Sequence, residues 1–436
     1  MQKISIRNFG PIDEIDLEIK DFMVLIGPQA SGKSTIAKLI YFFKSLDQDL
    51  LEYLLETDLP HGITRDGLQT FRNGFAAKLG EKFVEFFGVI RVMNPDFSLQ
   101  YHYSVDRWIQ LEKHQANDAW VQVTFSEAIY YTDLYQLYPQ VVVYKGLKEQ
   151  MITLGKKSLS IDAALVVNKA QEIEAQVRGI FAESLPALYI PAGRSLLAAF
   201  KYDAKLANYL DWFINQFLET RERETKPFFR DNPVLANEGG HRNAFESRFT
   251  RIIKGEYRVE RDLNERIYLP DGRRVLLQYA SSGQQEAIGF MLELLKFMID
   301  GSPAFVVIEE PEAHLYPPSQ MQAVEAIAAV FNSLSAAKFI ITTHSPYILT
   351  SLDNLVQAHE IAAANPEKAD QIADIVPRET WIAWDKLGVY MVAEGTVQDI
   401  RDAEYRGVGG SELDRDAETI GAVYERLLEI KYPIEA

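Results

Sequence analysis

The chain has 436 residues, of which 47% are hydrophobic, enough to bury the core of one large domain or of two or three ordinary ones. Its 62 acidic and 45 basic residues give a net charge of −17, which argues against a generic nucleic-acid coat, because neutralising phosphates needs clustered Lys and Arg. The absence of cysteine excludes disulfides and thiolate metal sites. No apolar stretch is long enough to span a membrane and no signal peptide is recognisable, so we expect a cytoplasmic protein.

The first 45 residues predict strands, a glycine-rich loop and a helix in that order. We expect two short strands around the turn "FGPIDE", the second of which leads through the apolar run 22–26 into the loop. Residues 35–43 then have the spacing of an amphipathic helix. Between them, "GPQASGKS" at residues 27–34 fits the pattern G-x-x-x-x-G-K-[ST]. A strand, a loop and a helix are the context that a phosphate-binding loop requires.

The chemistry of this loop predicts that the chain binds a nucleoside triphosphate. Its glycines let backbone N–H groups curl around phosphates, and the start of the helix adds partial positive charge. Lys33 would reach the β- and γ-phosphates, and the hydroxyl of Ser34 would bind Mg²⁺. The predicted nucleotide-binding residues of the loop are Gly27, Pro28, Gln29, Ala30, Ser31, Gly32, Lys33, Ser34 and Thr35.

The rest of the chain alternates between helical and strand-like patterns. The expected elements before residue 256 are helices across 35–90 and 162–185, antiparallel strands across 98–145, a short strand that starts at 187, and mainly helices across 196–255. After it we expect two strands around "PDGR", a helix from 281, a strand at 303–310, a helix at 319–334 and a strand at 337–346. The basic stretch at 220–230 leaves DNA contact open.

Two adjacent carboxylates follow the apolar strand that ends at Ile308. Glu309 would hold the water shell of Mg²⁺, and Glu310 would orient or deprotonate the attacking water. Two adjacent acids are also common in a solvated turn, but their presence in one chain with the phosphate loop favours catalysis. Residues 281–286 alone would be a helix cap, and His344 alone a structural histidine.

The order of these four features resembles an ABC-type ATPase head of the branch that contains SMC-like proteins, RecF and the OLD-family ATPases. "EEPEAHLYP" and "SSGQQE" are similar to the OLD and RecF forms, and "YIPAGR" at 189–194 resembles a motif of small ATPases in bacterial phage-defence systems such as Septu and PARIS. The resemblance implies an α/β P-loop NTPase fold, an ABC-type head with a mixed central sheet, an antiparallel β subdomain and helical insertions. It implies a core of residues 1–45, 185–200 and 255–365, insertions at 46–184 and 201–254, and a C-terminal hairpin and helix at 366–436.

The resemblance also implies a composite site in a homodimer closed by ATP. Signature residues of one copy would close over the γ-phosphate held by the other copy. Glu310 would be the catalytic carboxylate, His344 the γ-phosphate sensor, and Ser34 and Glu309 the Mg²⁺ ligands. The implied signature residues are Ser281, Ser282, Gly283 and Gln285, and Arg7 and Asn8 would lie near the nucleotide. Residues 189–194 are the candidate for the lobe-coupling segment, with Arg194 as its contact.

The sequence departs from the family pattern at two positions and ends in an ambiguous tail. Glu309 stands where many relatives have Asp, and Gln284 stands where transporters have a second glycine, as in OLD-like proteins. "VYMVAEGTVQDIRDAE" resembles the opening of a TOPRIM nuclease domain, but no D-x-D strand follows it. The favoured interpretation is a hairpin at "AEGT" and a helix at 417–430.

These features predict a Mg²⁺-dependent ATPase that lacks a nuclease site of its own. The leading hypothesis is an ATP sensor that switches a separately encoded effector, a nuclease or toxin, in anti-phage defence. The alternatives are a RecF- or SMC-like ATPase that clamps DNA, and a scaffold that binds ATP with negligible hydrolysis. The aromatic segments 101–108 and 128–139 fit either an interface with a partner or a buried core.

Overall fold

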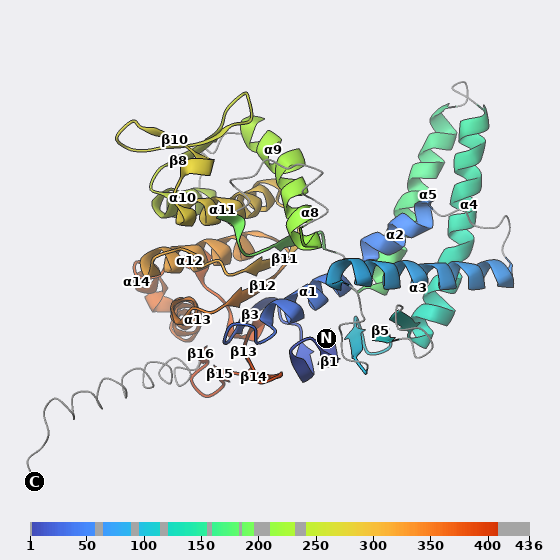
Figure 1. Ribbon diagram of the computed structural model, residues 1–436, viewed down its shortest axis with the longest axis horizontal. Coiled ribbons are helices and arrows are strands. Elements are labelled where there is room, and N and C mark those ends of the chain that lie inside the picture. The colour runs from blue at the N-terminus through green and yellow to red at the C-terminus, as the bar shows by residue number, and fades with distance from the viewer. Residues whose placement is uncertain are drawn as a thin grey trace, which may run out of the picture.

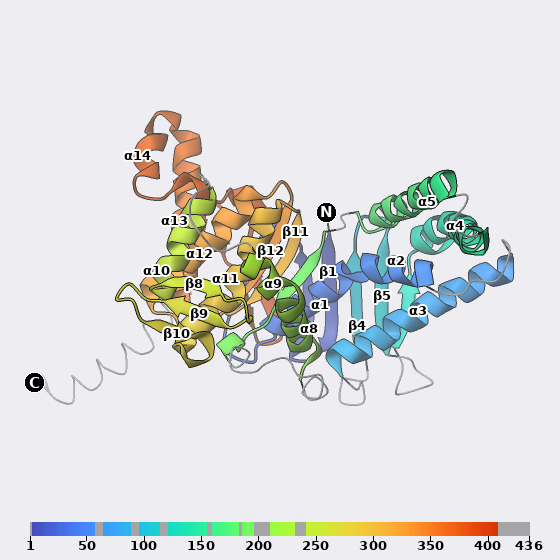
Figure 2. The ribbon, with the colours of Figure 1, turned by 90° about the horizontal axis from the view of Figure 1, so that it is seen from above.

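The structure is a computed structural model that describes residues 2–56, 64–88, 96–113, 121–154, 159–182, 185–195, 210–231 and 241–408. Two sheets organise it: a mixed six-stranded sheet and an antiparallel five-stranded sheet. Figures 1 and 2 show helices α11 to α13 near one end of the molecule and the helices α3, α4 and α5 at the other end. Among the described residues, no helix combines the length and the apolar character needed to cross a membrane.

The six-stranded sheet is the centre of the fold. Its strand order is β14-β13-β3-β12-β11-β7, and all neighbouring strands are parallel except β13 and β14, which are antiparallel. The strands are β3 (Phe22–Ile26), β7 (Ala187–Ile190), β11 (Ala304–Glu309), β12 (Ala337–Thr343), β13 (Leu387–Ala393) and β14 (Thr396–Asp399). β3 and β11 are buried at every position, as expected for parallel strands that are covered on both faces.

Alternate residues of these strands belong to two different hydrophobic cores. Met23 and Leu25 pack in the core that contains α1 (Lys33–Lys44) and the antiparallel sheet. Phe22 and Val24 pack in the other core, under three further helices. Those helices are α11 (Ser282–Asp300), α12 (Pro317–Ser333) and α13 (Pro346–Ala364). The two-residue period of a strand therefore divides the molecule into two layers around one sheet.

The parallel strands bring their carboxyl ends to one edge of the sheet. The register pairs Ile26, at the end of β3, with Thr343 of β12, and pairs Thr342 with Glu309 of β11. The segments that follow β3, β12 and β11 therefore start side by side. Ligands commonly bind at this edge of open α/β sheets.

The antiparallel sheet joins the N-terminal hairpin to strands from the middle of the chain. Its order is β2-β1-β4-β5-β6, with β1 (Lys3–Phe9), β2 (Ile12–Glu18), β4 (Ser98–His102), β5 (Trp108–Lys113) and β6 (Val121–Phe125). The predicted turn between the first two strands is confirmed, but the prediction that the second strand leads into the loop is wrong. β2 ends at Glu18 and a separate strand, β3, enters the loop, because the hairpin and β3 belong to different sheets.

Helices form the far end of the molecule, where Figure 1 shows α4 and α5 side by side as a projecting arm. They are α2 (Leu46–Glu56), α3 (Arg65–Phe87), the π-helix η2 (Ala128–Asp133), α4 (Leu134–Leu154) and α5 (Leu159–Ile180). The strands expected at 128–145 are wrong, since this segment is helical. Leu134, Leu137, Tyr138 and Val141 are buried at helical spacing, so packing of one face overrides the strand preference of the valines.

The two aromatic segments have different environments. Tyr101 and Tyr103 are buried in the core, whereas Tyr131 and Tyr135 are 64% and 58% exposed. The tyrosines of the first segment are therefore core, whereas two tyrosines of the second segment offer aromatic surface.

A third layer lies over α11 and α12. It contains α8 (Trp212–Thr220), η4 (Arg221–Thr225), α9 (Lys226–Asp231), α10 (His241–Ile253) and the antiparallel strands β8 (Glu256–Val259), β9 (Glu265–Tyr268) and β10 (Arg274–Leu276). The "PDGR" turn between β9 and β10 is confirmed, and β8 is an additional strand that its charged sequence concealed.

The hairpin predicted at "AEGT" is confirmed as β13 and β14, and it belongs to the central sheet. β13 pairs in parallel with β3, so residues 387–399 share a sheet with the phosphate loop rather than opening a separate domain. The short elements around it are η5 (Leu277–Tyr279), η6 (Pro366–Lys368), α14 (Ala369–Ala373), η7 (Arg378–Thr380), η8 (Trp384–Lys386), β15 (Arg401–Asp402) and β16 (Gly407–Val408). The helix expected at 417–430 lies outside the described residues.

Candidate functional site

The loop between β3 and α1 is enclosed by two neighbouring segments. A Cβ atom on Gly27 would lie 2.1 Å from the carbonyl oxygen of Val392 in β13, so only glycine fits there. Gly32 has φ 106°, and a Cβ on it would lie 3.1 Å from side-chain atoms of Pro11 and Ile12 in the N-terminal hairpin. The loop conformation therefore depends on glycine at both ends of the motif.

Lys33 is folded into the loop. Its Nζ donates to the carbonyl oxygens of Gly27 at 2.9 Å and Pro28 at 2.7 Å. Burial lowers the pKa of this ammonium group, and Glu310 and Glu312 oppose the shift. The positive charge thus lies on the concave side of the loop, where the phosphates of a nucleotide would supply stronger acceptors than the two carbonyls.

Glu310 follows β11 in a strained conformation and faces His344. Its φ is 43°, a left-handed value that costs a non-glycine residue on the order of 1–3 kcal/mol. Its N–H donates to the carbonyl oxygen of Thr342 at 2.9 Å. One carboxylate oxygen, Oε1, lies 3.2 Å from Nε2 of His344, and Nδ1 of the same ring lies 3.4 Å from Nζ of Lys33. The imidazole therefore joins the loop to the carboxylate.

Glu309 points toward β7. Its Oε1 accepts from the hydroxyl of Tyr189 at 2.7 Å, and its Oε2 accepts from the N–H of Ala192 at 3.0 Å. Each carboxylate oxygen keeps a further lone pair, which can accept from a metal-bound water. The hydroxyl of Ser34, at the start of α1, is exposed.

Oxygen atoms suited to Mg²⁺ and its waters are present at this edge. Buried Thr342 Oγ1 and Glu312 Oε2 have no hydrogen-bond partner among the described residues. Mg²⁺ prefers oxygen ligands and usually binds one or two carboxylates, waters and substrate phosphates, so it does not need a dedicated protein cage. The described part of the chain holds no cluster of three or more His, Asp or Glu placed for a metal ion. The donor set therefore fits a metal that arrives with a nucleotide.

Sequence reasoning missed Glu312, the third acid of "EEPEAH". Its Oε1 accepts from the hydroxyl of Thr343 at 2.7 Å and from the N–H of His344 at 2.8 Å. The carboxylate therefore fixes the backbone that carries the imidazole. An acid two positions after Glu310, with a strand end expected nearby, was the available signal.

Arg194 is not at the surface of the site. Its side chain is fully buried beneath the edge and forms an ion pair with Glu286 of α11 at 3.1 Å. Within one chain Arg194 is therefore a structural link to α11, and its expected role as the contact of the lobe-coupling segment stays a prediction.

The predicted signature residues open α11. Ser281 and Gln284 form a reciprocal cap, with the Ser281 N–H donating to Gln284 Oε1 at 3.0 Å. Gln285 is buried and donates to the carbonyl oxygen of Leu277 at 2.9 Å. Ser281 and Ser282 are exposed, and Gly283 lies against the backbone of His314. In the described residues, no hydrogen bond or ion pair links this segment to residues 27–35 of the same chain.

Arg7 and Asn8 lie on the strand that precedes the hairpin turn. Arg7 pairs with Glu14 at 3.2 Å and Asp16 at 2.7 Å, and donates to the carbonyl oxygen of Ile15. Asn8 has a left-handed φ of 53°. The hairpin meets the loop through the turn that follows these two residues, and Arg7 is engaged within the hairpin.

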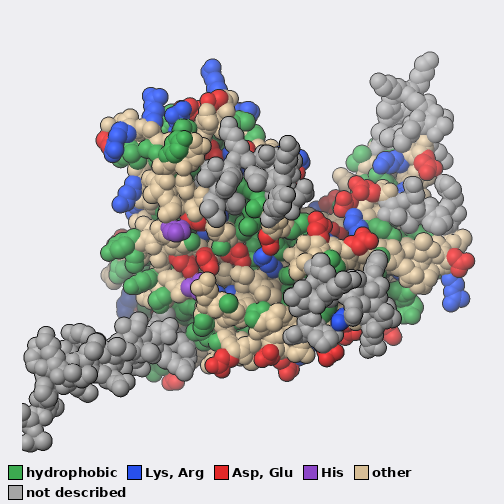
Figure 3. Space-filling model, in the orientation of Figure 1, with side chains coloured by type: hydrophobic (Ala, Val, Ile, Leu, Met, Phe, Trp, Pro, Cys, Tyr) green, Lys and Arg blue, Asp and Glu red, His purple; other side chains and the backbone are tan. Residues whose placement is uncertain are grey.

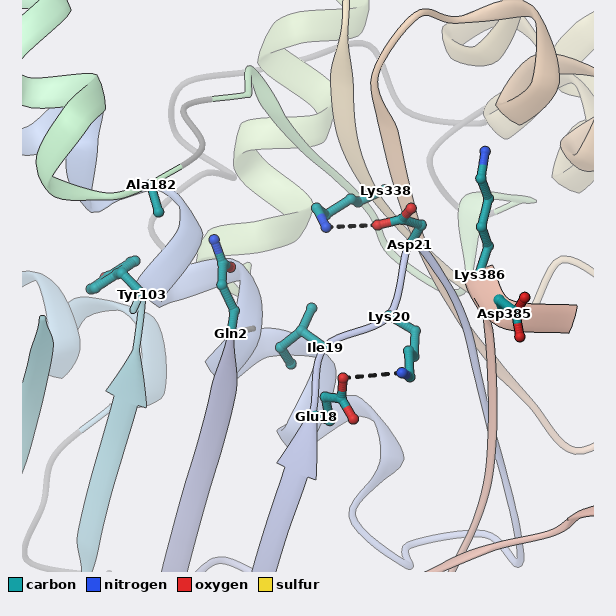
Figure 4. A pocket seen from close by; sticks show the side chains of 10 residues that line it. All are labelled: Gln2, Glu18, Ile19, Lys20, Asp21, Tyr103, Ala182, Lys338, Asp385 and Lys386. Carbon is teal, nitrogen blue, oxygen red and sulfur yellow. Dashed lines mark hydrogen bonds and ion pairs between the residues drawn. The ribbon is translucent and has the colours of Figure 1, made fainter. Parts of the chain in front are cut away.

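A pocket of about 360 Å³ lies at the opposite edge of the sheet (Figure 4). Asp21 and Lys338, which pair at 2.8 Å, stand where β3 and β12 begin, and Glu18 pairs with Lys20 beside them at 3.0 Å. Since the strands are parallel, their amino ends are remote from the phosphate loop. This pocket is therefore separate from the candidate site.

Known proteins similar to this chain comprise one family model and several solved structures. No curated protein matches the chain. Among solved structures, the SMC head domain from Thermotoga maritima is 12% identical, with 92% of this chain and 98% of that chain covered and a TM-score of 0.37. An Smc head bound to the C-terminal winged-helix domain of ScpA is 11% identical, with 91% and 95% covered and a TM-score of 0.42. An Smc head with an extended coiled coil, bound to the C-terminal domain of ScpA derived from Pyrococcus furiosus, is 11% identical, with 96% and 100% covered and a TM-score of 0.38.

The family model described as AAA ATPase domain matches residues 1–113 and 168–349, which is more than half of the chain. The matched ranges contain the phosphate loop, the two adjacent carboxylates, the start of α11 and His344. The chain belongs to the AAA ATPase domain family.

Proposed function

We propose that the protein is a Mg²⁺-dependent ATPase whose nucleotide state switches a separately encoded effector in bacterial anti-phage defence. The observation that supports the hydrolytic part is the continuous contact from Lys33 through His344 to Glu310. The lysine proposed to hold phosphate and the carboxylate proposed to act on water contact the two ring nitrogens of one imidazole. This proximity supports phosphoryl transfer to water, which depends on positioning a phosphate beside an oriented water.

Each residue of the site has one task in this proposal. The loop N–H groups and Lys33 bind the phosphates, and Ser34 and Glu309 would hold Mg²⁺. When bound, the metal would supply positive charge that neutralises the phosphates. Glu310 orients the attacking water and accepts its proton, and His344, the proposed γ-phosphate sensor beside Lys33, keeps the carboxylate in place through Nε2.

The switch in this proposal is a homodimer closed by ATP. α11 begins at exposed serines. The N-terminus of this 19-residue helix would attract a phosphate of the nucleotide that a second copy holds. Three exposed tyrosines flank the site: Tyr279 before the serines, Tyr316 after the acidic turn and Tyr347 after His344, at 74%, 77% and 53% exposure. Exposed aromatics that border a polar site support its burial against a protein surface.

The helical arm supports an interaction with a further protein. Exposed apolar side chains on η2, α4 and α5 are Tyr131, Tyr135, Val143, Leu165 and Val167. Co-expression with the product of the adjacent gene, followed by size-exclusion chromatography with and without ATP, tests the effector. We expect a complex that Tyr131→Ser and Tyr135→Ser together weaken, whereas Tyr405→Ser, at an equally exposed tyrosine elsewhere, leaves it intact. Elution alone with every neighbouring gene product contradicts the effector proposal.

A DNA-clamping ATPase is the second candidate, and one surface favours it. Lys and Arg side chains gather at the upper end of the face in Figure 3, where β8 to β10 carry the exposed arginines Arg258, Arg261, Arg273 and Arg274. Two of them are already paired, Arg258 with Glu256 at 2.8 Å and Arg273 with Asp271 at 2.6 Å, which reduces the charge available to phosphates. Tight, ATP-dependent and salt-sensitive binding of duplex DNA would replace the effector proposal with this one.

A further inference from the structure

We propose that Arg194 is a positioning residue that ties the backbone of Glu310 to helix α11, so that movement of this helix changes the aim of the carboxylate. The proposal rests on the ATPase function proposed above and assigns its regulation to a buried guanidinium group. It couples the position of the start of α11 to Glu310, the proposed water-activating residue, within one chain.

One side of the guanidinium group holds the end of β11. Nη1 of Arg194 donates to the carbonyl oxygen of Glu309 at 2.6 Å, and Nη2 donates to that of Glu310 at 2.9 Å. Nη1 also donates to Pro191 at the end of β7, at 2.7 Å. The carbonyl of Glu310 is thus bound by Arg194 while its N–H is bound by Thr342. Both ends of the left-handed residue are fixed.

The other side of Arg194 holds α11. Its Nε lies 3.1 Å from Glu286 Oε2 and donates to the Glu286 carbonyl oxygen at 3.3 Å. The carboxylate in turn accepts from the N–H groups of Arg194 at 3.2 Å and Ser195 at 2.9 Å. Glu286 is one helical turn beyond exposed Ser282. A displacement of the start of the helix is therefore transmitted to Arg194 through at least two polar contacts with Glu286.

The helix is shaped around this side chain. A Cβ on Gly289 of α11 would lie 3.0 Å from Cβ and Cδ of Arg194. The guanidinium also lies over the ring of Phe290, 5.4 Å from its centroid. The planar guanidinium group donates to several carbonyl oxygens at once, and an ammonium group cannot reproduce this geometry. Lysine is therefore not an equivalent replacement for Arg194. Arginine at this position links three segments that no single shorter side chain joins.

The closing experiment measures ATP affinity and steady-state turnover for Arg194→Lys, Gly289→Ala and a matched control. Arg194→Lys keeps the positive charge but loses the planar guanidinium group. Gly289→Ala places a methyl group against the Arg194 side chain, although alanine itself favours a helix more than glycine does. We expect both to lower kcat roughly ten- to a hundredfold, the scale of a small misplacement of a reacting group, with ATP affinity little changed. Adding either change to Glu310→Gln should cost nothing further, since the inference routes the effect through Glu310.

Arg221→Lys is the control for a merely structural role. Arg221 is also buried and pairs with Glu265 of β9, so its replacement disturbs a comparable ion pair away from the acidic turn. We expect it to lower the unfolding temperature and to leave kcat per folded molecule unchanged. A wild-type rate in Arg194→Lys and Gly289→Ala, or an equal loss of kcat in Arg221→Lys, overturns the inference.

A second readout separates this inference from the ATPase proposal. Hydrogen exchange of the amide of Glu310, which is bonded to Thr342, should be faster in Arg194→Lys than in the wild type and unchanged in Arg221→Lys. If the wild type does not hydrolyse ATP, the proposed function fails while this measurement still decides the inference. Equal exchange in the wild type and Arg194→Lys contradicts the link.

Discussion

Nζ of Lys33 lies 3.4 Å from Nδ1 of His344, although the two residues are 311 positions apart in the chain. The parallel pairing of β3 with β12 produces this contact, because it places the loop after one strand beside the first residue after the other. The opposite ring nitrogen of His344 reaches Glu310 at 3.2 Å. In the proposed function, phosphate bound by the lysine would therefore be sensed by the imidazole and the carboxylate without further intermediates.

Replacing Lys33 with alanine should weaken ATP binding by at least about tenfold. The change removes charge-assisted hydrogen bonds to phosphate, each worth about 1.5–3 kcal/mol. The measurement is the dissociation constant of a fluorescent ATP analogue. Lys38→Ala, one turn further along α1 in an ion pair with Asp211, should bind it like the wild type. Equal affinity in the Lys33 and Lys38 variants would contradict the loop assignment.

Replacing Glu312 with alanine should lower turnover by roughly tenfold or more and leave ATP affinity nearly unchanged. Glu312 accepts from the N–H of His344 and the hydroxyl of Thr343, so its loss frees the backbone that aims the imidazole. Glu312→Gln keeps an accepting oxygen and should recover most of the rate. If glutamine and alanine are equally poor, the carboxylate acts through its charge and not through position.

The local motifs of this site were predictable from the sequence, because each is a short pattern tied to a strand end. The loop, Glu309, Glu310 and His344 each follow an apolar run, and parallel pairing then places them at one edge. The contacts of Arg194 with Glu286 and Glu309 were not predictable, since they join residues at least 92 positions apart through backbone carbonyls that carry no sequence signal.

The secondary structure of segments whose packing opposes their local preference could not be predicted from the sequence either. The valines of α4 favour strand formation in isolation and are helical because one face is buried. The "IKD" segment at residues 19–21, which separates β2 from β3, is only three residues long, yet it takes the chain from one sheet to the other.

Replacing Glu293 with glutamine should stabilise the protein at neutral pH. Glu293 is buried in α11, and burial raises its pKa above 4.5, against opposition from the Thr225 hydrogen bond and Arg221. The unfolded chain therefore loses this proton first as the pH rises above about 4.5, and stability falls until the folded-state pKa is passed. Glutamine keeps an oxygen that accepts from Thr225, and because it does not ionise, it removes this fall in stability with rising pH.

Unfolding temperatures at pH 4.5 and pH 7.5 check this prediction. The advantage of Glu293→Gln over the wild type should be small at the lower pH and larger at the higher pH. An advantage that shrinks with rising pH contradicts the direction of the shift.

Mixing a Lys33→Ala protein with a Ser282→Ala protein should restore part of the ATPase activity. In a two-fold dimer with shared sites, each mixed dimer has one site that carries both defects and one that carries neither. Turnover is measured across mixing ratios at constant total protein. Activity that never exceeds the weighted average of the two variants would indicate that Ser282, exposed at the start of α11, does not complete a partner's site.

ATP retention by Glu310→Gln is the most direct measurement of the central claim that the protein is a hydrolysing ATPase controlled by Glu310. The amide keeps the shape and the hydrogen-bonding capacity facing His344 but cannot accept the proton of water. We predict that wild-type protein converts bound ATP to ADP, and that Glu310→Gln retains intact ATP with turnover lowered about a hundredfold or more. Wild-type turnover in Glu310→Gln would contradict the catalytic assignment, and intact ATP on the wild type would contradict hydrolysis itself.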